Sequence, residues 1–326
     1  MRVLHFNDCA FVAATLVAEA RAQGLDWRHL TPDLVRPRTQ PRGGLDRLRY
    51  LPYVARRIRA VGASDIVHVH YGTSASLLRQ RGVPHRPYVL SLHGTDIRTQ
   101  WHDPRFHDQL RRAIDEAAVV LYTNLDTAET TLQARPDARH LPQAVSPHGL
   151  PQWRPRGRET GTPRIVFAPR WSADKGVDAQ LGLAADLHRA LPHVELVGLD
   201  WGEGAKDAER AGVRLVPTMP HEAYLDLLAT ADLVIGQADV ILSVSDFEAM
   251  LIGAPVAALG ERLPSEDGTQ PPTLRGSRDE VVAQVAASIG DPAATAERLG
   301  ARAWVIAHHD PAQLVPMLET IYRQHV

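Results

Sequence analysis

Short runs of apolar, mostly β-branched residues alternate with longer amphipathic segments along the sequence, and this alternation constrains the fold more than any other feature. The first half holds such runs at 3–6, 66–70, 88–92 and 119–122, and the second half at 164–168, 194–199, 213–217, 232–236 and 254–259. Runs of this kind, separated by helices, predict parallel strands that are covered on both faces. Because the pattern occurs twice, we expect an α/β fold of two doubly wound, Rossmann-like parallel-sheet domains that face a cleft.

Helical patterns and a change of composition indicate where the domains end. Helices are expected at 45–60, 105–116 and 127–134, whereas residues 147–163 are rich in Pro, Gly and Arg and lack an apolar period. We therefore predict an N-terminal domain of residues 1–150, a linker of residues 151–163 and a C-terminal domain of residues 164–310. A last helical pattern at 311–326 is a candidate to pack back on the first domain, which the sequence alone does not decide.

The composition is that of a globular protein without a strong overall charge. Hydrophobic residues make up 44% of the 326 residues, charged residues make up 23%, and the formal net charge is −2. This balance provides no global field that would attract nucleic acid. No targeting segment is visible and no run approaches the ~20 apolar residues of a membrane-spanning helix, so we expect a cytoplasmic location. Peripheral membrane contact and the oligomeric state are left open.

Cys9 is the single cysteine of the sequence. It excludes an internal disulfide and a metal site built from several cysteines. A lone cysteine can be a nucleophile, but its place just after an apolar strand favours a small buried side chain.

Residues 49–61 are the nearest candidate for a helix on a membrane surface. They combine apolar and aromatic residues with several arginines, namely Tyr50, Tyr53, Val54, Ile58, Arg56, Arg57 and Arg59. Such a helix could lie in a membrane interface. We favour a helix that packs on the sheet and exposes its arginine face.

Two cations follow the first strand of the second half. The run 164–168 leads directly into Arg170 and Lys175, and Gly176 stands where the chain turns into the next helix. Cations beside a helix N-terminus suit a diphosphate, because the charges neutralise phosphate oxygens while backbone N–H groups donate to them. The alternative is a solvated basic turn in which Lys175 pairs with Asp174.

A glutamate and a proline-bounded loop complete the polar pattern of the second half. Glu248 lies on a predicted helix that leads into the strand at 254–259, and a glutamate there can accept both hydroxyls of a ribose. The alternative is a glutamate on a helix surface. Backbone groups of Thr218 and Met219, after the strand at 213–217, could hold a base.

These pieces fall in a fixed order: an Arg and a Lys-Gly pair after a strand, a Pro-His-Glu loop, and a Glu-Ala-Met segment that runs into Gly-x-Pro-Val. The order resembles the C-terminal domain of the GT-B glycosyltransferases of family 4. The matching residues are Arg170, Lys175, Gly176, Pro220, His221, Glu222, Glu248, Ala249, Met250, Gly253, Pro255 and Val256. The resemblance covers nearly the whole chain.

The resemblance implies a retaining, metal-independent transfer of a sugar from a UDP- or GDP-linked donor to a hydroxyl or amine acceptor, with no cofactor. Arg170 and Lys175 would act as catalytic residues by stabilising the leaving diphosphate. No Asp-x-Asp triplet, the usual metal–diphosphate clamp of the other main glycosyltransferase fold, occurs in the sequence. The acceptor cannot be read from the sequence and could be a small molecule, a lipid or a polysaccharide.

The first half supports the same resemblance. Residues 66–73 and 88–98 are similar to the family's paired strand ends, and the second carries the tetrad His-Gly-Thr-Asp. A lone histidine after a strand is more often structural, but in the family the histidine of this tetrad lies beside the donor sugar. The resemblance therefore implies a catalytic His93, with Asp96 orienting it or the following loop. Residues 140–155 resemble the family's hinge, with Gln143 and Ala144 replacing its Asn and Gly.

The acceptor side of the site is expected at the ends of the first strands. The residues assigned to it are Asn7, Asp8, Tyr71 and Asp96. His68 and His70 lie on either side of Val69 in a predicted strand, and we expect them to point to opposite faces of the sheet. They would then not bind one metal ion together, at least one of them would be structural, and no metal site is predicted.

The sequence departs from the family's pattern at two places. Many members carry a second glutamate that contacts the donor sugar, but Val240 stands at that position, with Asp239 one residue earlier. Either a bulge lets Asp239 replace it or the chain lacks this acid; Asp239, Ser243 and Val244 are included in the predicted donor site. The family's Gly-Gly pair in the first strand-to-helix loop is also missing, because residues 7–16 contain no glycine.

These departures motivate a second hypothesis of another class. The chain could be a catalytically impaired relative that binds a nucleotide or a glycan as a partner subunit. A Rossmann oxidoreductase is a weaker third hypothesis, because no Gly-x-Gly-x-x-Gly follows any predicted strand.

Overall fold

The computed structural model describes residues 1–37, 39, 43 and 48–326, so the predicted helix at 45–60 lies partly outside the described residues. The chain divides into two compact units, Met1–Ser146 with His309–Val326, and Pro147–His308. The segment 151–163, expected as a linker, belongs to the second unit. Trp153 Nε1 donates a hydrogen bond to the carbonyl oxygen of Ala231 at 2.8 Å and fastens this segment there.

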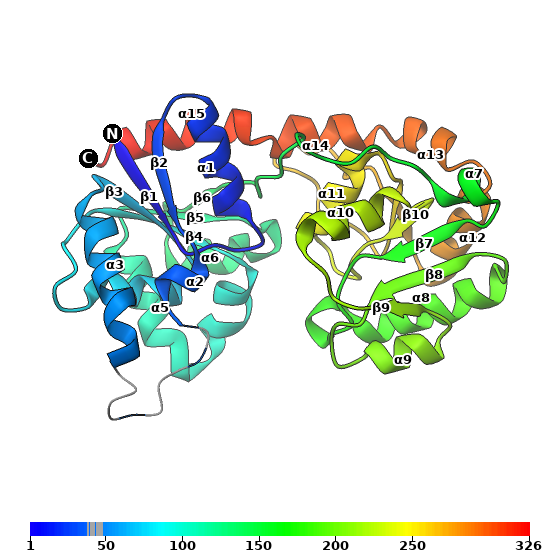
Figure 1. Ribbon diagram of the computed structural model, residues 1–326, viewed down its shortest axis with the longest axis horizontal. Coiled ribbons are helices and arrows are strands. Elements are labelled where there is room, and N and C mark those ends of the chain that lie inside the picture. The colour runs from blue at the N-terminus through cyan, green and yellow to red at the C-terminus, as the bar shows by residue number, and fades with distance from the viewer. Residues whose placement is uncertain (38, 40–42, 44–47) are drawn as a thin grey trace. The chain divides into compact units, whose positions relative to one another are not determined.

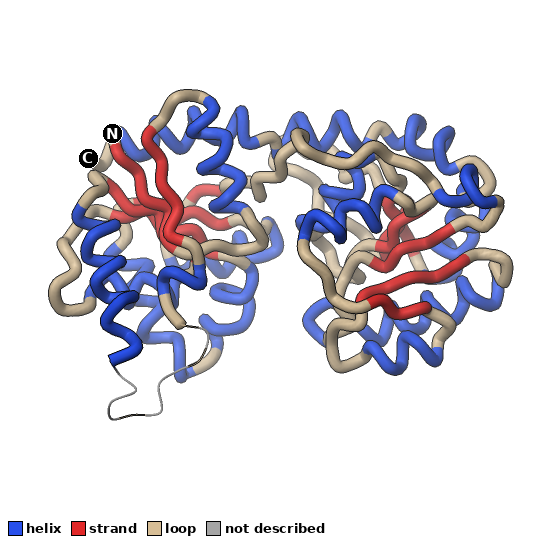
Figure 2. Tube along the Cα trace, in the orientation of Figure 1, coloured by secondary structure: helices blue, strands red, loops and turns tan. Residues whose placement is uncertain are grey.

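The first unit contains a parallel sheet that is six-stranded within the described residues, in the order β2-β1-β3-β4-β5-β6. Helices lie on both sides of this sheet (Figures 1 and 2). Its strands are β1 (Arg2–Phe6), β2 (Asp26–Leu30), β3 (Ile66–His70), β4 (Tyr88–Leu92), β5 (Val119–Tyr122) and β6 (Arg139–His140). Its helices are α1 (Val12–Ala22), α2 (Pro32–Val35), α3 (Leu51–Gly62), α4 (Gly72–Ala75), α5 (Pro104–Glu116), α6 (Ala128–Ala134) and α15 (Pro311–Arg323).

The second unit contains a second parallel sheet, also six-stranded in the part of the chain that the structure describes, in the order β12-β11-β10-β7-β8-β9. Its strands are β7 (Arg164–Phe167), β8 (Glu195–Leu199), β9 (Arg214–Val216), β10 (Leu233–Ile235), β11 (Val256–Leu259) and β12 (Leu274–Gly276). Its helices are α7 (Arg156–Thr160), α8 (Val177–Ala190), α9 (Ala205–Arg210), α10 (His221–Ala229), α11 (Val244–Ile252), α12 (Arg278–Ser288), α13 (Pro292–Leu299) and α14 (Ala301–His309). Both sheets are doubly wound, which confirms the predicted fold class.

The C-terminal helix α15 packs on the sheet of the first unit beside α1 (Figure 1). Its apolar residues enter a core cluster with Val3, Leu16 and Ile66; they are Leu314, Val315, Leu318, Ile321 and Tyr322. The opposite face of the same sheet is covered by another cluster around Phe6, Val67 and Leu90. Alternate residues of each strand therefore face α15, and these positions include several histidines.

Candidate functional site

The strand order of the second unit reverses direction between β7 and β10, and ligands of open α/β sheets bind outside the carboxyl ends of the strands at such a point. Residues 168–176 follow β7 and residues 236–243 follow β10. The second sheet thus brings together two loops that are far apart in the sequence. The polar side chains of these loops define the candidate site.

Lys175 and Gln237 connect the two loops. Lys175 Nζ donates a hydrogen bond to Gln237 Oε1 at 2.9 Å. Gln237 is 1% exposed, and its own Nε2 donates to the carbonyl oxygen of Ile241 at 2.9 Å. The ammonium group is therefore held beside the end of β10 by a fixed, neutral acceptor, which leaves its positive charge uncompensated by this contact.

Arg170 lies at the outer edge of the same loop. Its Nη2 pairs with Asp174 Oδ2 at 2.5 Å, its Nε donates to Ser172 Oγ at 2.9 Å, and its guanidinium stacks over the ring of Trp201. The side chain is 38% exposed. The alternative that the sequence left open, a basic turn with Lys175 on Asp174, is thus wrong in its pairing, because Arg170 occupies that carboxylate.

Gly176 sits where this loop turns into α8. Its φ of 72° is in the left-handed region, and a Cβ placed there would lie 2.7 Å from the carbonyl oxygen of Ala238. Residues with a Cβ are disfavoured on both counts, so the close approach of the two loops requires glycine. The loop after β10 is fixed from its other side by the buried Arg262, whose Nη2 donates to the carbonyl oxygens of Gln237 and Leu259 and whose Nη1 donates to that of Asp239.

Glu248 is a buried residue of α11 rather than the surface glutamate of the alternative interpretation. Its Oε1 lies 2.7 Å from His221 Nε2, at the first residue of α10. This hydrogen bond to a carboxylate raises the pKa of His221 above its ordinary value. Glu248 is 6% exposed, so the pair forms a polar wall of which the imidazole is the more accessible part.

The remaining predicted donor residues lie in the loops around this pair. Thr218 is exposed and Met219 half-buried between β9 and α10. Ser243 caps α11 through a reciprocal pair of hydrogen bonds with Asp246, and Val244 is the first residue of that helix. Asp239 Oδ1 accepts a hydrogen bond from the backbone N–H of Val240 at 2.7 Å, so this carboxylate closes its own turn.

In the first unit, the predicted acceptor residues Asn7, Asp8 and Tyr71 follow β1 and β3, where that sheet reverses direction. Asn7 and Tyr71 have left-handed φ values of 70° and 74°. Asn7 Nδ2 donates to Ser74 Oγ at 2.8 Å, while Asp8 accepts from backbone N–H groups of α1 and its preceding turn. The half-buried Cys9 contacts the Tyr71 hydroxyl through Sγ at 2.9 Å, and burial raises the pKa of Tyr71.

His93 and Asp96 lie at the end of β4. The side chain of His93 is 2% exposed, its Nε2 is 3.2 Å from His70 Nδ1, and its Nδ1 is 3.3 Å from Thr123 Oγ1. Burial lowers the pKa of His93 to about 3, so the ring is neutral. Asp96 is fully buried and accepts from the backbone N–H of His93 at 3.0 Å, and burial raises its pKa to about 7. Both ring nitrogens of His93 are thus hydrogen-bonded inside the unit.

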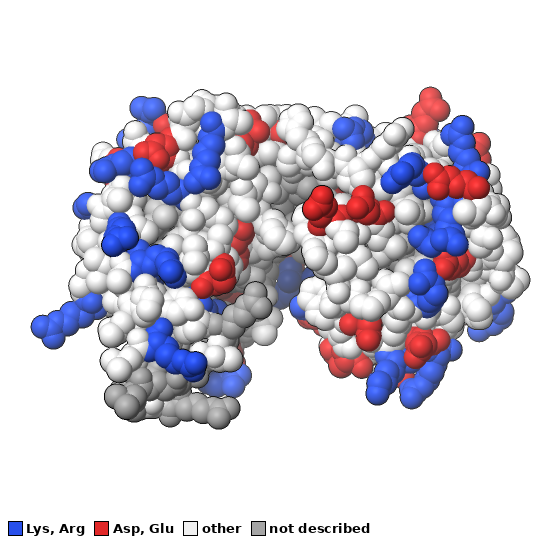
Figure 3. Space-filling model, viewed as in Figure 1, with Lys and Arg blue, Asp and Glu red and all other residues white. Residues whose placement is uncertain are grey.

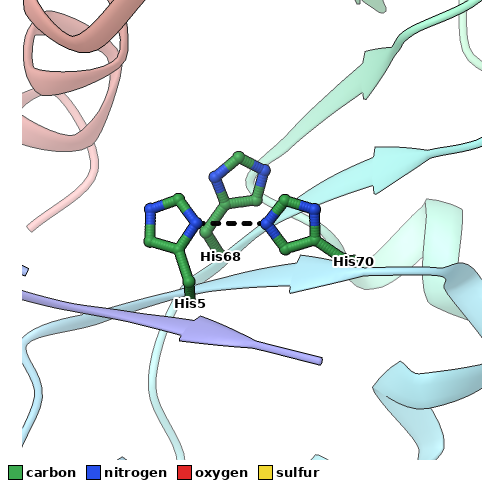
Figure 4. Close-up of side chains that lie close together, drawn as sticks. All are labelled: His5, His68 and His70. Carbon is green, nitrogen blue, oxygen red and sulfur yellow. Dashed lines mark hydrogen bonds between the residues drawn. The ribbon is translucent and has the colours of Figure 1, made fainter. Parts of the chain in front are cut away.

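The expectation that His68 and His70 point to opposite faces is wrong. Side chains two residues apart in a strand point to the same face, and the two rings stack with centroids 4.6 Å apart. His5 joins them from β1, so the three imidazoles project from one side of the sheet (Figure 4). Sequence reasoning missed His5 and Tyr322, although the strict alternation of His68 and His70 in their strand was a readable signal.

The ligand atoms of His5, His68 and His70 lie within 4.8 Å of one another, as in a metal site. An imidazole binds a metal ion along its ring plane, at about 2 Å for zinc. The rings of His68 and His70 are inclined by only 19°, so their planes meet far from both rings. As placed, these two histidines cannot bind one ion together, and their hydrogen bonds account for the cluster better.

The helix α3 was the candidate for a membrane surface, and its arginines were expected to be exposed. The structure bears this out only in part. Arg56 and Arg59 are exposed, but Arg57 is fully buried and its guanidinium donates to the carbonyl oxygen of Val35 and to Gln80 Oε1, each at 2.5 Å. Among the described residues, no helix is long and apolar enough to cross a membrane. Basic and acidic side chains both appear on the visible face of each unit (Figure 3).

The whole chain is similar to solved glycosyltransferase structures. HepE of Anabaena, in complex with UDP, shares 16% identity over 99% of this chain and 100% of its own, with a TM-score of 0.66. Sucrose-phosphate synthase from Thermosynechococcus elongatus shares 15% identity over 99% of both chains, also with a TM-score of 0.66. AviGT4, a glycosyltransferase involved in avilamycin A biosynthesis, shares 16% identity over 100% of this chain and 98% of its own, with a TM-score of 0.59.

The chain has a GT-B-like fold. At these identities the likeness establishes the fold alone, and it confirms at that level the resemblance read from the sequence. The sequence matches no protein-family model. It also matches none of the curated proteins.

Proposed function

We propose that the chain is a glycosyltransferase whose second unit binds the nucleoside diphosphate of a UDP- or GDP-linked sugar. The observation that carries the proposal is the position of Lys175, held by Gln237 at the point where the second sheet reverses direction. Structures of the similar protein HepE contain UDP and UDP-glucose. The sugar would pass to a hydroxyl or amine acceptor on the side of Asn7, Asp8 and Tyr71.

The proposed chemistry is a transfer without a metal ion and with retention at the sugar carbon. The diphosphate leaves with negative charge on its oxygens, and a fixed cation aimed at that charge lowers the barrier. Lys175 and Arg170 would supply the charge, and the N-terminus of α8 would supply backbone N–H groups. Arg170 would have to exchange its pairing with Asp174 for the diphosphate, whereas Lys175 already faces a neutral partner.

Glu248 and His221 would contact the ribose or the sugar. The Oε1 of Glu248 is engaged by His221, and the carboxylate remains able to accept hydrogen bonds through its second oxygen. Thr218 and Met219 would hold the base through their backbone groups. Both ring nitrogens of His93 are hydrogen-bonded within the first unit. We therefore propose that His93 has a structural role at the end of β4 and does not transfer a proton.

A second function, a nucleotide- or glycan-binding partner subunit, is favoured by one observation. Val240 occupies the position where the resemblance implies a glutamate; it is 42% exposed, and the neighbouring Asp239 carboxylate accepts from the Val240 N–H. Val240 has no carboxylate, and one oxygen of the Asp239 carboxylate is engaged within its own turn, so the glutamate that the resemblance implies has no direct replacement. Such a chain would bind the nucleotide but would not release it from the sugar.

Isothermal titration with UDP and GDP tests the binding site. A charge-assisted hydrogen bond contributes about 1.5–3 kcal/mol, so Lys175→Ala should weaken nucleotide binding roughly 10- to 100-fold. Lys206→Ala, which removes an exposed lysine of α9, is the matched control and should bind as the wild type does. Absence of binding to either nucleotide, or equal binding by the wild type and Lys175→Ala, would contradict the proposal.

A donor-hydrolysis assay separates the two functions. Slow release of UDP or GDP from the cognate nucleotide sugar, diminished in Lys175→Ala, supports the transferase. Nucleotide binding at the same site without any release across a panel of UDP- and GDP-sugars supports the partner subunit.

A further inference from the structure

A row of buried polar side chains crosses the face of the first sheet that α15 covers. They come from four adjacent strands or their ends and from α15, and each is at most 5% exposed: Ser91, His68, Tyr322, His5, His70, His93 and Thr123. We call this set the histidine chain. Polar groups buried in an apolar core are retained only where they find hydrogen-bond partners. Most of the partners in this row are other members of the row.

The first part of the histidine chain runs from β4 to the C-terminal helix. Ser91 Oγ lies 2.7 Å from His68 Nε2, and His68 Nδ1 lies 2.5 Å from the Tyr322 hydroxyl. The Tyr322 hydroxyl in turn lies 3.4 Å from His5 Nε2. Tyr322 therefore connects two histidines that have no hydrogen bond to each other.

The second part runs from β1 to the end of β5. His5 Nδ1 lies 3.1 Å from His70 Nε2 (Figure 4), His70 Nδ1 lies 3.2 Å from His93 Nε2, and His93 Nδ1 lies 3.3 Å from Thr123 Oγ1. Thr123 Oγ1 also donates to the carbonyl oxygen of Leu92 at 3.4 Å. Every ring nitrogen of the four histidines has one partner in the chain.

The protons of such a chain can be arranged in two directions. A neutral imidazole donates from one nitrogen and accepts at the other, so the state of one ring fixes that of the next. If the Ser91 hydroxyl donates to His68 Nε2, each following group in the row accepts one hydrogen bond and donates the next. The last donor is the Thr123 hydroxyl, which donates to the carbonyl oxygen of Leu92. In the opposite direction the Ser91 hydroxyl must accept, and its own proton has no acceptor among the described residues. A buried donor without a partner is costly, so the first direction is favoured.

We infer that the histidine chain has a single direction, from Ser91 to Thr123, and that its four histidines are all neutral and protonated on Nδ1. Burial lowers the pKa of each of them below its ordinary value, which agrees with neutral rings. Tyr322 is then a positioning residue, because a hydroxyl group can accept from His68 and donate to His5 at once. Through it, the C-terminal helix fixes which nitrogen of His68 carries the proton.

This inference goes beyond the proposed function and does not rest on it. The test uses the full chain labelled with 15N in histidine, and long-range 1H–15N correlation spectra that distinguish the two tautomers. In the wild type, all four histidines should be protonated on Nδ1 and should not change between about pH 5 and 8. A histidine of the chain that is protonated on Nε2, or that becomes charged in this range, would overturn the inference.

Thr123→Val tests whether the chain acts as one unit. The substitution removes the acceptor of His93 Nδ1–H, so each direction now leaves one donor without a partner. The two directions should become comparable in population, and all four histidines should show both tautomers in the same proportion. A change confined to His93 would show that the rings are independent and would overturn the inference.

Tyr322→Phe tests the connection through the C-terminal helix, with Tyr88→Phe as the matched control. Tyr322→Phe should allow His68 alone to adopt both tautomers. The other three histidines, His5, His70 and His93, should keep the proton on Nδ1. Tyr88 is a buried tyrosine of the same unit that donates to the carbonyl oxygen of Ala113 at 2.7 Å, and its variant should alter none of the four. If Tyr322→Phe does not fold, Thr123→Val still tests whether the histidine chain has a single direction.

Zinc is the remaining arm of the test. Addition of Zn²⁺ should leave the four histidine signals of the wild type unchanged. Loss of the Nδ1–H signal of His5 together with shifts at His68 and His70 would show a metal site in place of the hydrogen-bonded chain.

Discussion

Lys175 Nζ and the buried Oε1 of Gln237 lie 2.9 Å apart, so the ends of β7 and β10 share a hydrogen bond at the point where the second sheet reverses direction. The contact orders a flexible side chain before any ligand arrives, which reduces the entropy that binding would cost. It also leaves the charge of Lys175 for a ligand, because an amide oxygen is neutral. The candidate site is therefore preformed at Lys175, the residue on which the proposed binding of the diphosphate depends most.

The close approach of the same two loops can be tested at Gly176. Gly176→Ala should destabilise the second unit by about 3 kcal/mol, because the new Cβ meets both a left-handed φ and the carbonyl oxygen of Ala238. Gly161→Ala is the matched control: its φ is 76°, but nothing lies within 4 Å of the added Cβ, so about 1 kcal/mol is expected. Equilibrium urea unfolding measures both. Equal losses would show that the loops do not constrain Gly176.

The pair of His221 and Glu248 predicts a pH-dependent contribution to stability. The folded-state pKa of His221 is raised by its hydrogen bond to Glu248, so the contribution is fully present below the ordinary value of 6.5 and is lost as the pH rises through the raised value. Glu248→Gln should therefore be less stable than the wild type below about pH 6 and should approach it above about pH 8. The difference should be about 0.5–1 kcal/mol, since the imidazole is 35% exposed and solvent screens the pair.

Glu222→Gln is the control for this pair. Glu222 follows His221 directly but is exposed, so its variant should run parallel to the wild type when urea unfolding is repeated across the pH range. A difference between Glu248→Gln and the wild type that grows with pH would contradict the assigned sign.

Asp96 predicts a dependence of the same sign in a more acidic range. Burial raises its pKa from 3.8 to about 7, so the folded state holds a proton that the unfolded state releases, and stability falls as the pH rises from about 4 to about 7. Asp96→Asn resembles the protonated form and should lose this dependence. Its stability relative to the wild type should rise across that window by up to about 4 kcal/mol.

Asp108→Asn is the control for Asp96, because the Asp108 side chain is 89% exposed on α5. Thermal unfolding of the three proteins at several pH values measures the comparison. If Asp96→Asn and the wild type keep a constant difference between about pH 4 and 7, the Asp96 carboxyl does not hold the extra proton.

The fold could be predicted from the sequence to the extent that its strands are long and buried. The runs at 66–70, 88–92 and 119–122 coincide with β3, β4 and β5 because parallel strands covered on both faces are continuously apolar. The missed strands lie at sheet edges. β2 reads Asp-Trp-Arg-His-Leu and exposes its charged residues, while β6 and β12 span only 2 and 3 residues. Strands of that kind form through tertiary contacts, and no apolar run in the sequence marks them.

The candidate site could be predicted only where charge marks a strand end. Arg170 and Lys175 stand out because cations directly after a buried run are chemically conspicuous. Gln237 and Arg262 could not be inferred, since their roles depend on loops that meet only in the folded sheet. The error at His68 and His70 had another source, because the two-residue period of a strand places them on one face.

Arg57 provides a test of why α3 is not a simple basic helix. Its guanidinium is fully buried and donates to the carbonyl oxygen of Val35 and to Gln80 Oε1. Arg57→Met should destabilise the first unit by about 2–4 kcal/mol, because both acceptors lose a charged donor in the interior. Arg56→Met removes an exposed arginine of the same helix and should change stability by no more than about 0.5 kcal/mol. Urea unfolding of the two variants gives the comparison, and equal effects would mean that Arg57 is not held in the core.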